Sequence, residues 1–333
     1  MSLATMANQE MGQYWLARAA LLTVTFLASV VIFTISMCGV RIQDDFVRTS
    51  FNYAKATIAI FSLGCCFDAV KLILAFVAWR TDAQVDALTI SIFGVLASLA
   101  MNITHIFIFV LLVRIATCIV LAHTGEMGNT DGRVELASYG SALVLKFLAL
   151  AIAALSVREA AGPNMDANLL YYLVVSFRSF VCLIAVLVVG RAVQVKYRVR
   201  FNERITKVST LLVVASGIWL LPTTYEVVEI FTFQSLNRPS FKLYFHILEV
   251  VLVVWPAFTT LCVILAIYIK KHDGLSSATQ TFETVGPATQ QMHWIGNYDA
   301  PQYVCQHRGP VSSGASYYSA GAAQPIAVPP SAH

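Results

Sequence analysis

The stretch LLVVASGIWLLPTTYEVVEIF (residues 211–231) is followed, after a short link, by LYFHILEVVLVVWPAF (residues 243–258). Both segments are apolar enough for a membrane span, yet they carry carboxylates that spans normally avoid: Glu226 and Glu229 in the first, and Glu249 in the second. A carboxylate in hydrocarbon costs about 2.5 to 3.5 kcal/mol on insertion scales, so an embedded one marks a functional site by default. We therefore expect a site where these two segments lie together.

The composition of the whole chain agrees with this interpretation. Of its 333 residues, 58% are hydrophobic and 12% are charged, which is far from the balance of a soluble protein. The net charge of +4 is too small to indicate a nucleic-acid partner. We expect a polytopic membrane protein.

A membrane-spanning helix needs about 20 largely apolar residues. Seven segments of the chain qualify, and they predict an all-α bundle of seven transmembrane helices: 19–40, 54–79, 87–112, 137–156, 168–190, 208–231 and 243–269. Cytoplasmic loops carry the excess of Lys and Arg, and that excess follows the first, third, fifth and seventh segments. The N-terminus is therefore expected outside or in the lumen, and the C-terminus in the cytosol.

The expected domains are a short N-terminal segment at 1–18, the helix bundle at 19–270 and a cytosolic tail at 271–333. The tail is rich in Ser, Ala, Gly, Gln and Pro and has few large aliphatic residues. Such a composition buries too little apolar surface to fold, so the tail is expected to be disordered.

The carboxylates fall in two pairs with helical spacing. Glu226 with Glu229, and His246 with Glu249, are each i,i+3 neighbours that share a helix face. The rise of about 1.5 Å per residue puts Glu226 and Glu249 at one depth. Like charges held close in an apolar site cannot all ionise, so one carboxyl is expected to keep its proton, as a general acid must. The alternatives are a solvated Glu229 near the headgroups and a purely structural His246.

Aromatic side chains surround these acids in the sequence: Trp219, Tyr225, Trp255 and Phe258. Their faces can stabilise a cation, so they are candidate substrate-binding residues. Pro222 cannot donate a hydrogen bond within its helix, which predicts a local opening there.

Other embedded charges favour a structural role. Asp68 and Lys71 are i,i+3 neighbours and predict an internal ion pair. Lys146 and Arg178 also need acceptors, and we expect them to share Asp68 or backbone carbonyls. His105 is expected to be a packed, hydrogen-bonded residue.

Several protein classes lack their defining residues here. No lysine lies between Lys242 and Lys270, so the last helix cannot form a retinal Schiff base. The common receptor motifs are missing, since the third segment ends LLVRIAT and the seventh has WPAF. The chain also lacks a histidine cluster, a DDxxD motif and a P-loop, so we expect no metal and no cofactor.

Seven spans, short loops, embedded acids and a low-complexity tail together resemble fungal polytopic membrane proteins. Among these the chain looks most like the integral-membrane terpene cyclases of meroterpenoid secondary metabolism. That resemblance implies acid-catalysed, metal-independent cyclisation or isomerisation of an apolar isoprenoid epoxide or olefin taken from the lipid, in the endoplasmic reticulum. A seven-helix receptor-like or transport protein without enzymatic activity is the alternative, and for it the plasma membrane is a possible site.

Overall fold

The computed structural model describes residues 3–38, 45–81, 86–124, 128–162, 167–201, 203–235 and 247–269. All of them belong to the first of the two units into which the chain divides, Met1–Pro287 and Ala288–His333. The tail expected at 271–333 lies outside the described residues, and so does His246.

Helices account for almost all of the described chain, which contains no strand. They are α1 (Leu3–Cys38), α2 (Asp45–Thr81), α3 (Ala87–Thr124), α4 (Asn129–Ala161), α5 (Ala167–Arg198), α6 (Glu203–Ser235), the π-helical segment η2 (Val250–Val254) and α8 (Trp255–Ile269). Seven helices are long and apolar enough to cross a membrane. The predicted all-α architecture is confirmed, and the seven long apolar helices support an integral, multi-pass membrane protein. The first helix begins earlier than expected, because the segment predicted to precede it is itself helical from Leu3.

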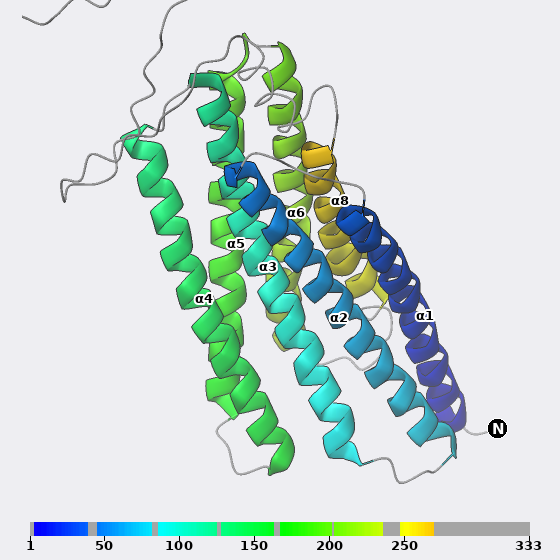
Figure 1. The fold of residues 1–333 in the computed structure, drawn as a ribbon. Coiled ribbons are helices and arrows are strands. Elements are labelled where there is room, and N and C mark those ends of the chain that lie inside the picture. Colours follow the sequence, from blue (N-terminus) through cyan, green and yellow to red (C-terminus); the bar gives the residue numbers. More distant parts are fainter. Residues whose placement is uncertain are drawn as a thin grey trace, which may run out of the picture. The chain divides into compact units, whose positions relative to one another are not determined.

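Helix α3 lies at the centre of the bundle. It packs against α2, α4, α5, α6 and α8, whereas α1 packs on α2 and the last span (Figure 1). Every side chain from Ile108 to Val120 is buried. A helix that is apolar on all sides is typically buried in this way. Its start is capped by Asp86, whose carboxylate accepts the backbone N–H of Leu88 at 3.1 Å. Side chains carried by α3 can therefore reach most of the other helices.

Helix α1 buries mainly small and polar residues and exposes large apolar ones. On α1, Ser29 is fully buried and shares a 2.7 Å hydrogen bond with Ser62 of α2. Val24, Leu27 and Val31 of the same helix are more than half exposed. Helices in lipid pack through small residues and direct their large apolar side chains outward, so this inverted pattern agrees with a bundle surrounded by hydrocarbon.

The last span contains the irregular helical turn of the bundle. In η2 the backbone N–H of Trp255 donates to the carbonyl of Val250, one residue further back than in an α-helix. The next residue is Pro256, which has no N–H and whose ring crowds the preceding turn, so the helix widens there. The opening expected at Pro222 does not interrupt α6, which runs through that residue as one α-helix.

The contact between α2 and α3 provides a test of this packing. A Cβ atom at Gly64 would lie 3.2 Å from both the Cβ of Ala100 and the sulfur of Met101. We expect Gly64→Leu to lower the free energy of unfolding by about 1–3 kcal/mol, the usual cost of overpacking. Gly140→Leu is the matched control, because no atom lies within 4 Å of a Cβ at that position. Thermal unfolding of the purified variants in detergent measures both effects. Equal changes in the unfolding temperature of Gly64→Leu and Gly140→Leu would contradict the described packing.

Candidate functional site

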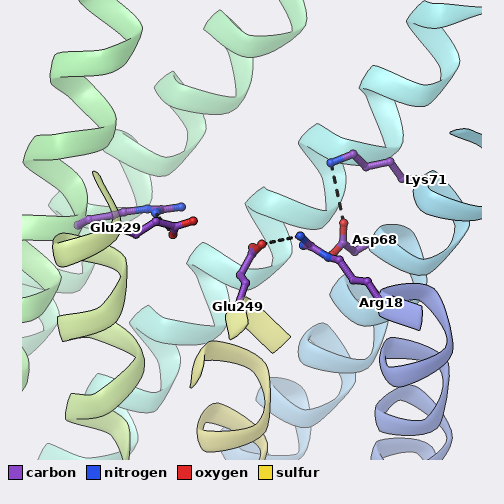
Figure 2. Close-up of polar contacts among 6 residues, drawn as sticks. Arg18, Asp68, Lys71, Glu229 and Glu249 are labelled. Carbon is purple, nitrogen blue, oxygen red and sulfur yellow. Dashed lines mark hydrogen bonds and ion pairs between the residues drawn. The ribbon is translucent and has the colours of Figure 1, made fainter. Parts of the chain in front are cut away.

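A buried arginine links three of the helices. Arg18 of α1 donates through one terminal nitrogen to Glu249 at 2.5 Å and through the other to Asp68 of α2 at 2.8 Å. Lys71 completes the group with its ammonium 3.9 Å from the second oxygen of Asp68. Figure 2 shows Arg18 between its two acidic partners. We call these four residues the Arg18 network; it fixes α1 and α2 to the residue that immediately precedes η2.

The ion pair expected between Asp68 and Lys71 is confirmed. The bundle was expected to begin at residue 19, so Arg18 was assigned to the short N-terminal segment and not to the first span. Lys146 was expected to share Asp68 or backbone carbonyls; its ammonium lies over the ring of Phe107, 4.9 Å from the centroid. The reason is topological: α4, which carries Lys146, packs against α3 and α5.

Glu229 has a different cationic partner. Its carboxylate lies 3.5 Å from a terminal nitrogen of Arg178, so this ion pair joins α5 to α6. Arg178 therefore does not share Asp68, because its own neighbouring helix supplies a carboxylate. Glu229 also interacts electrostatically with Glu249 and Glu226, which brings the three carboxyls of the last two spans into one region.

Glu226 is held against a neutral group. Its Oε1 lies 3.8 Å from Nε2 of His105, a fully buried residue of α3. The indole N–H of Trp219 donates to Nδ1 of the same ring at 3.2 Å. Because Nδ1 accepts a hydrogen bond, it carries no proton, and the imidazole is the neutral form with its N–H at Nε2. That N–H has no hydrogen-bond partner among the described residues, and it lies beside the Glu226 carboxyl.

The partners of the embedded charges therefore separate the acids. The polar groups in this half of the bundle comprise the cations Arg18, Lys71 and Arg178 and the carboxyls Asp68, Glu226, Glu229 and Glu249. Each carboxyl except Glu226 lies against one of these cations. Among these four carboxyls, Glu226 is therefore the one that lies against a neutral group instead of a cation.

The aromatic candidates lie in unlike surroundings. Trp219 is fully buried and is engaged with His105, and Phe258 stacks on Phe61 with centroids 6.0 Å apart. Trp255 is 43% exposed and directly follows the wide turn of η2. Tyr225 is partly buried, and its hydroxyl has no hydrogen-bond partner among the described residues. The hydroxyl of Tyr225 interacts electrostatically with Glu229, Glu249 and Arg18, so it belongs to the same region.

A second polar cluster lies at the opposite end of the bundle. Asp131 of α4 is buried, hydrogen-bonds to Arg191 of α5 and lies 3.7 Å from Arg198. Arg114 of α3 lies 3.9 Å from Glu135. The sequence analysis missed these contacts because each joins residues on different helices, and only the position of Arg114 inside an apolar segment could have indicated one.

No protein-family model matches the chain, and no curated protein matches its sequence. Within the described residues, no three His, Cys, Asp or Glu side chains gather as a metal site would require. The function must therefore be argued from the site itself.

The Arg18 network provides a test that needs no ligand. Arg18→Gln leaves Asp68 and Glu249 without their main cation. We therefore expect the free energy of unfolding to fall by about 3–5 kcal/mol. Arg80→Gln, at an exposed position on α2, is the control and should leave the free energy of unfolding almost unchanged.

A triple variant separates lost charge compensation from lost packing. Adding Asp68→Asn and Glu249→Gln to Arg18→Gln removes the uncompensated charges, and much of the stability should return. Denaturant unfolding in micelles measures all of these variants. If the triple variant were as unstable as the single one, charge compensation would not be what Arg18 provides.

Proposed function

We propose that this protein is a membrane-embedded acid catalyst that protonates an apolar isoprenoid substrate, with Glu226 as the proton donor. The observation that supports the proposal is the neutral partner of Glu226. A neighbouring arginine favours the ionised form of a carboxyl, whereas a buried carboxyl whose neighbour is a neutral imidazole lacks that stabilisation and can keep its proton. A protonated carboxyl is the group that opens an epoxide or adds a proton to a double bond.

His105 supports the same role. Its Nε2 lies 3.8 Å from Oε1 of Glu226, which is too long for a hydrogen bond. Contacts of this kind often tighten when a substrate fills the site. Donation from the imidazole would stabilise the carboxylate that remains after proton transfer.

The neighbouring groups suit the later steps of such a reaction. Glu249 and Glu229 lie against arginines, and a negative charge on either could stabilise a developing carbocation or accept the terminating proton. The free hydroxyl of Tyr225 can hydrogen-bond an oxygen of the substrate, and its ring can face the cation. No metal or cofactor is needed for these steps.

The class of substrate and the location follow from the surroundings of the site and from the resemblance to terpene cyclases. An apolar isoprenoid would enter from the lipid between the helices. We place the N-terminus on the lumenal side of the endoplasmic reticulum membrane and the basic ends of α4 and α5 in the cytosol, which is the side that cations favour.

Turnover of a prenylated epoxide tests the acid directly. Glu226→Gln keeps the shape of the side chain but cannot donate an acidic proton, so we expect activity to fall by at least ~10²-fold with normal membrane expression. Glu159→Gln, at an exposed position on α4, is the control and should retain activity. If Glu226→Gln converted the substrate as fast as the parent protein, the proposed mechanism would be wrong.

The protonated acid can also be detected without any substrate. The parent protein should show the infrared carbonyl stretch of a buried carboxylic acid at neutral pH. Glu226→Gln should abolish that band, whereas Glu229→Gln and Glu249→Gln should preserve it because each of those two carboxyls lies against an arginine. Loss of the band in either of the latter two variants, but not in Glu226→Gln, would assign the proton to a different residue.

A seven-helix receptor-like protein is the second candidate, and one observation favours it. The central helix α3 carries a polar contact in each half of the bundle, His105 with Glu226 and Arg114 with Glu135. A ligand that alters the first contact can shift α3 and thereby change the second. Failure of the parent protein to convert any isoprenoid would make this the better proposal.

A further inference from the structure

The end of α5 carries two prominent exposed aromatic residues. Tyr197 is 70% exposed and Phe201, in the turn that follows the helix, is 85% exposed. They continue the outward-facing apolar stripe of the helix, on which Leu183 and Leu187 are also more than half exposed. A stripe that faces hydrocarbon and ends in aromatic rings is typical of a helix that emerges through the headgroup layer.

The turn that carries these rings is held in place by the protein. Val199, between the two aromatic residues, is fully buried, and its carbonyl accepts a hydrogen bond from the hydroxyl of Thr206 at 3.0 Å. The aromatic rings are therefore presented on a fixed piece of backbone.

Positive charge surrounds the two rings. The guanidinium of Arg200 lies over the ring of Phe201, 4.5 Å from its centroid, and Arg200 is itself exposed. Lys196 precedes Tyr197 and is partly exposed, and Arg133 is exposed in the first turns of the neighbouring α4.

The acids described at this end of the bundle do not offset these cations. Asp131 and Glu135 are largely buried and are already paired, the first with Arg191 and Arg198 and the second with Arg114. Among the side chains that the structure describes here, the exposed charge is therefore positive. The opposite end differs, since Asp86 and Glu159 are exposed there together with Arg80 and Arg158.

We propose that Lys196 and Arg200, with Tyr197 and Phe201, bind the headgroup of an anionic phospholipid. The rings lie at the boundary of the hydrocarbon, and the cations contact the phosphate and the carboxylate of the headgroup. Each cation near an anionic surface contributes about fivefold to binding, so the group as a whole can select anionic from neutral lipid.

A lipid explains the surface better than an acidic protein does. The aromatic rings continue the lipid-facing stripe of α5, so the partner that covers them must also be continuous with the bilayer. A free phosphate ion would use the cations but would leave both rings exposed to water. The proposal is independent of the acid chemistry at Glu226, because the two sites lie in opposite halves of the bundle.

Native mass spectrometry of the full-length protein released from bilayers provides the test. Bilayers of phosphatidylcholine that contain a minor share of phosphatidylserine are the probe. The parent should retain phosphatidylserine in preference to phosphatidylcholine. Lys196→Gln combined with Arg200→Gln should reduce that preference roughly 25-fold, at about fivefold for each cation. Arg80→Gln combined with Arg158→Gln removes two exposed cations from the other end and should leave the preference unchanged.

Further measurements separate the alternatives. Tyr197→Ser combined with Phe201→Ser should weaken retention of the lipid while the protein remains folded, as judged by its thermal unfolding. If Arg80→Gln combined with Arg158→Gln lost the preference for phosphatidylserine to the same extent, the preference would depend only on the total charge of the protein. That result would overturn the proposal. Displacement of the bound lipid by inorganic phosphate alone would indicate a phosphate site instead. Failure of the parent to prefer phosphatidylserine, together with binding of a polyglutamate peptide, would indicate an acidic protein partner.

Discussion

Arg18 holds a full positive charge inside an apolar helix bundle, and the packing around it follows from the need to compensate that charge. An ion taken from water into a low-dielectric interior is tolerated only when an opposite charge meets it with good geometry. Asp68 and Glu249 meet this requirement from two different helices. Association of helices in lipid has little hydrophobic driving force, so polar contacts of this kind determine which helices become neighbours. The position of α1 and the start of the last span are set by one side chain.

The same requirement distinguishes the embedded acids from one another. Composition makes Glu226, Glu229 and Glu249 equivalent, but their surroundings do not. Two of them face arginines, whereas Glu226 faces an imidazole whose tautomer is fixed by an indole N–H. Trp219 therefore acts at a distance, because its hydrogen bond determines which nitrogen of His105 carries the proton. A site can in this way contain several carboxyls and still assign the proton to one of them.

The number of helices and the pair Asp68–Lys71 could be predicted because both are local properties of the sequence. Hydropathy over about 20 residues defines a span, and i,i+3 spacing defines a helix face. The partner of Glu249 could not be predicted, since Arg18 is 231 residues away in the chain. The same applies to His105, whose contact with Trp219 joins residues 114 apart. Lys146 was misplaced for the converse reason, because shared depth in a membrane does not make two helices neighbours.

The wide turn of η2 sets the rotational phase between the two parts of the last span. An α-helix advances by about 100° per residue, and a turn closed one residue further back contains one more residue, so each residue in it advances by less. Glu249 immediately precedes this turn and Trp255 immediately follows it. Regular α-helical winding of the same residues would rotate Glu249 relative to Trp255 by roughly 100° and away from Arg18, while the packing of α8 could remain unchanged. The wide winding of this short run of apolar residues, rather than the identity of any one of them, is therefore what keeps the acid aligned with its arginine.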